Sequence, residues 1–372
     1  MTSIWVGRSI KIYSVYYTRT QSVDRIRSML IKFKLISGYS ITNGKFTISP
    51  KGLDVAVGIP KGNTNLSGKV LILDDRLQQH GSLVGESLGS YFGYSLASLD
   101  ADGDGMTDLA VGAPMYTQPG PPLEFEQGRV YIFYQRPVGL FSRMQPLDGQ
   151  RSRARFGMAL ASLGDQMGDG AHSLAVGAPY DGPDRRGCVY VFHGRQGQGL
   201  RTQPSQVLAA EHFSFGPGSA SAQLRTFGFA LSSGIDLTDD DLSDLVIGSY
   251  ASDAAVFLRS RPVVHQSTTL KVTPDSISLE NRDCIGPNHI RVACVQVEFC
   301  LGYNGSRAVA DDLRFRWNVT LDAQKPTNGV VSRMFLLPAA GFGSQVWQHQ
   351  GILHVQKSKK SCTNFTAYIS VG

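Results

Sequence analysis

The sequence predicts an all-β protein in which a partial β-propeller precedes an immunoglobulin-like β-sandwich. Three observations predict it: a strand pattern that repeats four times, a turn-rich composition with 41 glycines and 18% charged residues, and strict hydrophobic alternation near the end of the chain. We expect propeller blades in residues 37–262 and part of a sandwich in residues 263–372. Residues 1–36 are a basic segment that we assign to neither domain.

The repeat opens with an aromatic residue and a glycine and closes with Gly-Ala-Pro or a related triplet. The two glycines of a copy are 19 or 20 residues apart, whereas successive copies are 55, 64 and 71 residues apart. A constant interior with variable connections is typical of a structural unit that carries loop insertions. Another β-rich run follows each copy, so each supplies the strands of one four-stranded blade. The glycine pairs are Gly38 and Gly58, Gly93 and Gly112, Gly157 and Gly177, and Gly228 and Gly248.

The pattern changes after about residue 265, where the glycine repeat stops. Alternate apolar residues from Leu313 to Leu321 point one way and polar residues the other, as in a half-buried strand. The run from Val295 to Phe299 alternates in the same way. Four cysteines in this region predict two disulfides in an exposed β domain. Their spacing favours Cys284–Cys294 and Cys300–Cys362, although sequence alone leaves three pairings open.

The net charge of +6 comes from one end of the chain. Residues 1–51 hold nine Lys or Arg and one acidic residue, and the remainder holds 27 basic and 29 acidic residues. This distribution disfavours nucleic-acid binding by the folded part. The sequence contains no uninterrupted run of about 18 apolar residues, so it predicts no membrane span. The first 35 residues also lack the pattern of a secretory signal.

Glycosylation motifs provide the evidence for the cellular compartment. Four Asn-x-Ser/Thr sequons, three of them in the cysteine-bearing segment, indicate the secretory route. The fifth cysteine, Cys188, lies in a strand-like run, and we expect a buried small hydrophobic side chain rather than a reactive thiol. The sequon asparagines are Asn65, Asn304, Asn318 and Asn364.

The strongest chemical motif is an acidic loop inside the second copy. Calcium binds six to eight hard oxygen donors, and carboxylates at positions 1, 3, 5 and 9 of a tight loop can converge on one ion. Gly105 permits the turn, whereas Val111 stands where an EF-hand needs glutamate, so we expect a β-hairpin loop. An unoccupied acidic turn is the alternative. The predicted ligands are Asp100, Asp102, Asp104, the carbonyl of Met106, and Asp108.

The equivalent loops of the other copies are less complete. Asp241 replaces the turn glycine in the last copy, and Met167 and Ser173 replace carboxylates in the third. The first copy, at residues 42–48, has no acidic loop, and we expect no metal there. Candidate calcium ligands are Asp236, Thr238, Asp240 and Asp244 in the last copy, and Asp165 and Asp169 in the third.

Catalytic signatures do not emerge from the sequence. The eight histidines are scattered, and neither a Gly-x-Ser-x-Gly elbow nor a phosphate loop is present. We therefore expect a protein that is not an enzyme. The alternatives are a secreted enzyme with an accessory propeller and a free-standing carbohydrate-binding propeller. The cysteine-paired sandwich after the last blade argues against the carbohydrate-binding propeller.

The paired Phe-Gly and Gly-Ala-Pro motifs around Asp-x-Asp-x-Asp-Gly-x-x-Asp, with a sandwich following, resemble the integrin α subunits. The resemblance covers residues 37–370 and implies the last four of seven FG-GAP propeller blades and the start of the thigh domain. The phrases that begin at Gly112, Gly177 and Arg225 are most similar to the insect position-specific, Arg-Gly-Asp-binding class. Blades one to three and a transmembrane helix are outside this resemblance, so we expect a partial subunit.

The resemblance implies a cell-surface receptor that forms a heterodimer with an integrin β subunit and binds extracellular-matrix proteins. In the family, residues after the Phe-Gly glycines form an aromatic cage for a basic residue of the β subunit. They match Tyr39, Tyr94 and Phe229 here, with Met158 in the third copy. Core packing is the alternative role for these aromatic residues. The calcium loops would lie on the opposite face and stiffen the blades.

Overall fold

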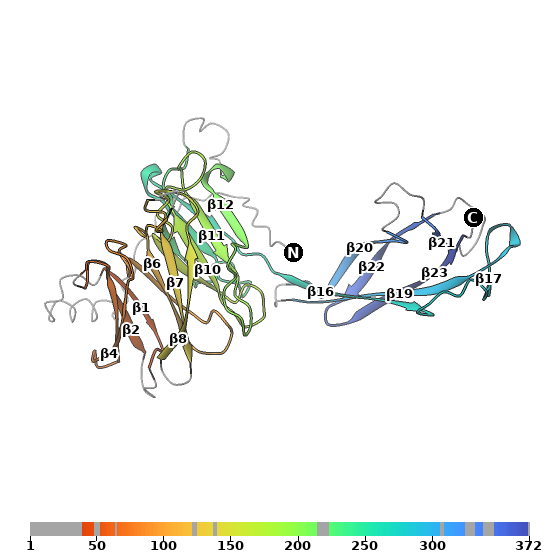
Figure 1. Cartoon of the computed structure of the whole chain (residues 1–372), viewed down its shortest axis with the longest axis horizontal. Coiled ribbons are helices and arrows are strands. Elements are labelled where there is room, and N and C mark those ends of the chain that lie inside the picture. Colours follow the sequence, from red (N-terminus) through yellow and green to blue (C-terminus); the bar gives the residue numbers. More distant parts are fainter. Residues whose placement is uncertain are drawn as a thin grey trace. The chain divides into compact units, whose positions relative to one another are not determined.

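The chain divides into two compact units, and the boundary between them in the sequence lies between Pro262 and Val263. Both units consist mainly of antiparallel strands, so the all-β prediction is confirmed (Figure 1). The basic segment 1–36 and Gly38 lie outside the described residues. The computed structural model describes residues 39–47, 53–63, 65–120, 125–136, 140–213, 223–305, 309–323, 332–337 and 346–370.

The described part of the first unit contains four antiparallel sheets, and each is formed by strands that follow one another along the chain. The strands of the first two sheets are β1 (Ser40–Gly44), β2 (Asp54–Ile59), β3 (Lys69–Leu73), β4 (Gln79–Val84), β5 (Ser95–Leu99), β6 (Asp108–Ala113), β7 (Arg129–Arg136) and β8 (Leu140–Asp148). The strands of the last two are β9 (Ala159–Gly164), β10 (Ser173–Ala178), β11 (Cys188–Phe192), β12 (Gln206–Ala209), β13 (Phe227–Ser232), β14 (Leu245–Ser249) and β15 (Ala254–Leu258). Short 3-10 helices occur at Ala210–His212 and Tyr250–Ser252.

Over its described residues, the second unit has two larger sheets and a two-stranded ribbon, with sheet orders β16-β19-β23-β21, β20-β22 and β17-β18. A third 3-10 helix lies at Pro287–His289. The strands are β16 (Val264–Thr273), β17 (Cys284–Ile285), β18 (Arg291–Val292), β19 (Cys294–Gly305), β20 (Asp312–Thr320), β21 (Met334–Leu336), β22 (Gln348–Gln356) and β23 (Lys360–Ile369).

The last sheet of the first unit differs from the prediction of four strands for every copy. Among the described residues it has only the three strands β13, β14 and β15. The next strand, β16, pairs along its whole length with β19 of the second unit. The chain therefore leaves the first unit after β15 and adds no fourth strand to the last sheet from this direction.

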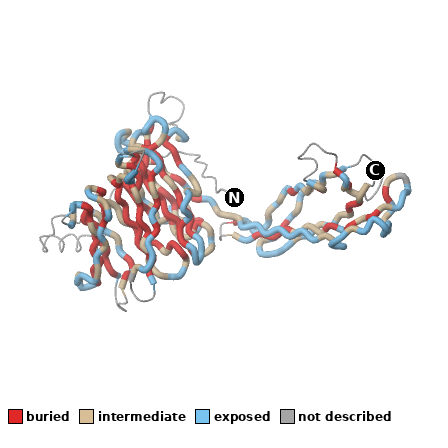
Figure 2. The backbone as a smooth tube through the Cα atoms, in the orientation of Figure 1, coloured by how far each residue is buried: buried red, intermediate tan, exposed pale blue. Residues whose placement is uncertain are grey.

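The second strand of a blade is the most buried one. All six residues of β2, β6 and β10 are buried. After a polar first residue, each strand is a continuous run of apolar residues and glycine, as in the Asp-Leu-Ala-Val-Gly-Ala of β6. Burial on both faces removes the polar alternation expected of a surface strand. Figure 2 shows buried backbone concentrated in the sheets of this unit.

The two glycines of the repeat contact each other between neighbouring blades. A Cβ atom on the closing glycine of one copy would overlap the carbonyl oxygen of the opening glycine of the next copy. The opening glycines also have φ values of 85° to 89°, which favour glycine over other residues. The motif therefore records the close approach of adjacent sheets. The contacting pairs are Gly58 with Gly93, Gly112 with Gly157, and Gly177 with Gly228.

Phenylalanines that precede the opening glycines fill the space between sheets. Phe92, Phe156 and Phe227 are each at most 2% exposed. Each belongs to a different hydrophobic cluster, and the cluster around Phe156 draws on residues from β5 to β11. Successive sheets thus share their cores, as blades of a propeller do.

The second unit has smaller hydrophobic clusters than the first. Trp317 of β20 packs against Phe299 of β19 and Phe365 of β23, with ring centroids 5.4 Å and 6.4 Å away. Along β20, Trp317 is buried while Arg314 and Arg316 are exposed, so the predicted alternation is confirmed. Contacts between β20 and the larger sheet make this unit a sandwich.

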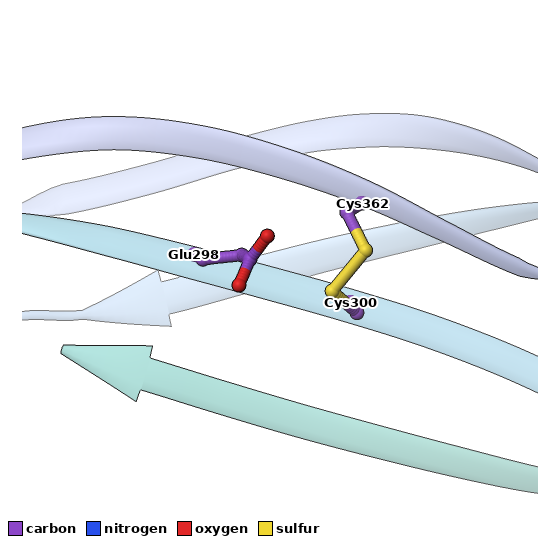
Figure 3. Close-up of side chains that lie close together, drawn as sticks. All are labelled: Glu298, Cys300 and Cys362. Carbon is purple, nitrogen blue, oxygen red and sulfur yellow. A yellow bond between two sulfur atoms is a disulfide. The ribbon is translucent and has the colours of Figure 1, made fainter.

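Two disulfides join strands of the second unit. They are Cys284–Cys294 and Cys300–Cys362, which is the pairing favoured by spacing. Cys300 and Cys362 stand directly opposite each other on β19 and β23. Figure 3 shows this disulfide with the carboxylate of Glu298 nearby. The remaining cysteine, Cys188, is buried and free, and burial raises the pKa of its thiol to about 12.

Candidate metal centre

The loop that joins β5 to β6 is held by hydrogen bonds from backbone N–H groups to its carboxylates. The carboxylate of Asp100 accepts bonds from the N–H groups of Asp104 (3.1 Å) and Gly105 (2.8 Å). Asp108, the first residue of β6, accepts bonds from the N–H groups of Ala101 (2.8 Å) and Gln135 (2.9 Å). The first and ninth residues of the loop thus fix its shape.

Three carboxylates converge inside this loop. Oxygen atoms of Asp100, Asp102 and Asp108 all lie within 4.8 Å of one another. Asp102 is buried, and its Oδ1 atom has no hydrogen-bond partner. A buried, unpartnered carboxylate oxygen is costly, and three convergent carboxylates are typical ligands of a hard divalent cation. The donor set of this loop therefore fits calcium.

The electrostatics of the loop agree with this interpretation. Burial raises the pKa of Asp108 to about 7, against the opposing effect of its hydrogen bonds from Gln135 and Ala101. Burial, followed by the charges of Asp104 and Asp100, raises the pKa of Asp102. The ionised loop is thus unfavourable by itself. A bound cation would supply the missing counter-charge.

Two further predicted ligands, Asp104 and Met106, lie outside the group of three convergent carboxylates. The carboxylate of Asp104 is exposed, accepts a hydrogen bond from the N–H of Met106 (2.8 Å), and is not one of the three convergent groups. Their predicted roles as ligands remain predictions.

All three acidic loops share one backbone frame. In each, the carboxylate of the first residue accepts a hydrogen bond from the N–H of the sixth. In each, the fourth and sixth residues have positive φ, where glycine is favoured and aspartate is better tolerated than most residues. Asp241 therefore keeps the turn that glycine makes elsewhere. The positive-φ residues are Gly103 (68°) and Gly105 (83°), Gly168 (73°) and Gly170 (87°), and Asp239 (56°) and Asp241 (61°).

The loop between β9 and β10 lacks convergence among its described residues. Asp165 uses Oδ1 to accept backbone hydrogen bonds from Met167 (3.2 Å) and Gly168 (2.6 Å). Asp169 accepts one from the N–H of Ala171. At the ninth position, Oγ of Ser173 lies 3.0 Å from Nδ1 of His193. A Ser–His contact thus stands where the second blade has a carboxylate.

The loop between β13 and β14 keeps its carboxylates but engages them differently. Asp244 accepts hydrogen bonds from the N–H of Leu237 (3.0 Å), the hydroxyl of Thr238 (3.3 Å) and the N–H of Ser260 (2.9 Å). Asp240 forms an ion pair with Arg259, in which both Nε and Nη2 lie 3.1 Å from Oδ2. Asp236 accepts a hydrogen bond from the N–H of Thr238 (3.0 Å).

The first blade contains a carboxylate that sequence reasoning missed. β1 ends at Gly44, so the connection to β2 begins later than the predicted loop at residues 42–48. Asp54, the first residue of β2, accepts hydrogen bonds from the N–H groups of Phe46 (2.8 Å) and Thr47 (2.6 Å). Its place at the start of the second strand matches that of Asp108. The signal was available, because an aspartate precedes the apolar strand in both copies.

The predicted cage residues lie at the starts of their blades. The rings of Tyr39 and Tyr94 are 4.5 Å apart, and the hydroxyl of Tyr39 donates a 2.8 Å hydrogen bond to that of Tyr94. Phe229 stacks on Tyr250 at 5.2 Å. Met158, at the equivalent place in the third blade, is buried. The structure thus brings two of the three aromatic residues together, and the third has another partner.

Surface chemistry elsewhere is simpler. The four sequon asparagines Asn65, Asn304, Asn318 and Asn364 are all exposed. Glu298 lies near Cys300 and Cys362 (Figure 3), but both sulfurs are in the disulfide and so are not thiolate ligands. Within the described ranges, no helix has the length and apolar character needed to cross a membrane.

Comparisons with known proteins agree with the geometry. Residues 92–133 match the FG-GAP repeat, and residues 260–371 match the integrin alpha Ig-like domain 1. Integrin alpha-PS2 of Drosophila melanogaster is 39% identical over 339 residues, which are 89% of this chain and 23% of that protein. Integrin alpha-IIb of Homo sapiens is 38% identical over 311 residues, or 82% of this chain and 28% of that protein. Integrin alpha-V of Gallus gallus is 34% identical over 328 residues, or 88% and 30%.

The chain spans less than a third of the length of these relatives. Each of the three alignments is longer than the first unit, so each includes residues of both units. With FG-GAP blades, an Ig-like sandwich and these relatives together, the chain belongs to the integrin α family.

Proposed function

We propose that this chain is an extracellular part of a cell-adhesion receptor, an integrin α subunit that pairs with an integrin β subunit to bind extracellular-matrix proteins. The observation that carries the proposal is the alignment with integrin alpha-PS2 across 89% of the chain, propeller and sandwich alike. A secreted enzyme or carbohydrate-binding propeller would share the FG-GAP repeat, but the match to the integrin alpha Ig-like domain favours the receptor. The role is one of binding, not catalysis.

Calcium is the proposed cofactor. Asp100, Asp102 and Asp108 would hold it, because their oxygens converge and one of them is buried without a partner. Asp104 and the carbonyl of Met106 are proposed to complete the shell. The bound ion would neutralise the loop and so stiffen the connection between β5 and β6. The loops that begin at Asp165 and Asp236 are weaker candidates, since the first has Ser173 in contact with His193 at its ninth position and the second has Asp240 paired with Arg259.

The partner surface is proposed to include Tyr39, Tyr94 and Phe229. Tyr39 is 59% exposed, and neighbouring aromatic rings offer faces that attract a Lys or Arg side chain. The exposed sequons and the two disulfides suit the outside of a cell. These features support a heterodimeric receptor at the cell surface.

The test is co-precipitation of the whole chain with the extracellular region of integrin β subunits in calcium. We expect capture by at least one β subunit, and weaker capture of a Tyr94→Ala, Phe229→Ala double variant. Phe125→Ala is the matched control, because Phe125 is an exposed aromatic residue outside the proposed cage. If folded chain, verified by a cooperative melt, is captured by no β subunit, the receptor proposal fails for this chain. If Phe125→Ala weakened capture as much as the double variant, the cage residues would have no specific part in the proposed partner surface.

A further inference from the structure

In the second, third and fourth blades, one position lies within or directly after the third strand, beside the start of the second strand where the acidic loop ends. Strand register defines it: Leu109 pairs with Phe133, Leu174 with Phe192, and Leu245 with Leu258. The residues that follow these partners are therefore structurally equivalent. They are Tyr134, His193 and Arg259.

The residue at this position differs between blades, and so does its contact with the acidic loop. Tyr134 donates a hydrogen bond from its hydroxyl to Gln145 (2.6 Å) and accepts one from the N–H of Leu200 (2.9 Å), so it does not satisfy the loop of its own blade. That loop retains the unpartnered oxygen of Asp102. His193 instead contacts Ser173, the ninth residue of its loop.

Arg259 contacts the fifth residue of its loop. Its Nε and Nη2 atoms both lie 3.1 Å from Oδ2 of Asp240, whose side chain is only 6% exposed. The other oxygen of Asp240 accepts a hydrogen bond from the N–H of Leu242 (3.2 Å). Both oxygens of Asp240 are therefore partnered, in contrast to Asp102. A hydrogen bond between two ionised groups is stronger than one between neutral groups.

We infer that Arg259 is a built-in counter-ion of the loop Asp236–Asp244, which keeps this loop folded without a metal ion. A cation that binds there must compete with the guanidinium for Asp240. Two loops with the same backbone frame thus differ in their need for calcium: the fifth residue of one, Asp240, meets an arginine, whereas the other keeps the unpartnered oxygen of Asp102 where the last loop has Thr238. The competition rests on the proposed calcium binding, whereas the effect of Arg259 on loop folding does not.

Hydrogen exchange followed by mass spectrometry on the whole chain tests the inference. We would compare Arg259→Gln with the unchanged protein, in calcium and in chelator. In chelator, we expect amides of residues 236–244 to exchange about tenfold faster in Arg259→Gln, and calcium to restore their protection. Residues 100–108 should gain protection from calcium equally in both proteins. Arg195→Gln, which removes the same charge from an exposed side chain of the third blade, is the matched control.

Arg259→Lys provides a second variant that retains the charge, and we expect it to recover part of the protection. Equal exchange of residues 236–244 in chelator with and without Arg259 would overturn the inference. A large calcium response of this loop in the unchanged protein, equal to that of residues 100–108, would also overturn it. If no loop responds to calcium, the proposed calcium site fails, while the comparison in chelator still decides the role of Arg259.

Discussion

The two units reach stability by different means. In the first, the second strand of three blades is buried on both faces, and neighbouring sheets share their cores. In the second, strands such as β16 and β22 expose most of their residues, and two disulfides link β19 to β17 and to β23. Figure 2 shows the same contrast in burial along the two backbones.

The difference shows what each pattern of sequence requires. Stacked blades depend on shape, because each sheet is buried only when its neighbour fits closely. A sandwich with small hydrophobic clusters gains stability from covalent links that restrict the unfolded chain. The comparison predicts that packing changes damage the first unit selectively and disulfide changes the second.

The largest effect is expected from Phe156→Ala. Loss of this ring, 2% exposed between the second and third sheets, should lower the free energy of unfolding of the first unit by about 4 kcal/mol. Hydrogen exchange resolved by unit would show faster exchange in residues 39–262 alone. Phe125→Ala, at a position 54% exposed, should change little. Comparable loss of protection in residues 263–370 would show that the units are not independent.

Removal of the Cys300–Cys362 bridge should have the next largest effect. The double change Cys300→Ala, Cys362→Ala should destabilise the second unit by about 3 kcal/mol, because the bridge closes a long loop in the unfolded chain. Urea unfolding followed by the fluorescence of Trp317 and Trp347, in a background that carries Trp5→Phe, reports on this unit. An equal loss of hydrogen-exchange protection in the first unit would contradict the prediction that disulfide changes affect the second unit selectively.

Gly112→Ala tests the contact between blades. The added methyl group would overlap the carbonyl oxygen of Gly157, so we expect a loss of about 2 kcal/mol in thermal or urea unfolding. Gly81→Ala is matched, since a Cβ there would meet nothing within 4 Å. Tolerance of Ala at position 112 would mean that the sheets can separate without cost, contrary to the shared core.

Asp102→Asn should give the smallest effect, and its sign should depend on calcium. In chelator, removal of a buried unpaired charge should raise stability by about 1 kcal/mol, whereas in calcium the loss of a ligand should lower it by a similar amount. Melting in both conditions measures this reversal. Asp169→Asn, outside the convergent group, should show no reversal. The same sign in both conditions would argue against an ion at Asp102.

Much of the fold could be predicted from sequence because its signals are local and repeated. The spacing of glycines identified the blades, and alternation around Trp317 identified a sandwich strand. That the last sheet has three strands among the described residues could not be predicted in this way, since the pairing of β16 with β19 depends on residues far along the chain. The first-blade carboxylate Asp54 was missed for a different reason: its loop was aligned a few residues too early.

By itself, the sequence determined the strand repeat, the acidic loops and the cysteine framework, because periodicity and turn chemistry are written in neighbouring residues. Only the tertiary structure decided which carboxylates converge and which are already paired. Asp102 and Asp240 both belong to acidic loops of similar sequence, yet one has an unpartnered buried oxygen and the other meets Arg259. Arg259 follows β15 and lies 19 residues beyond Asp240 in the sequence, and burial then sets the energetic consequence of each charge.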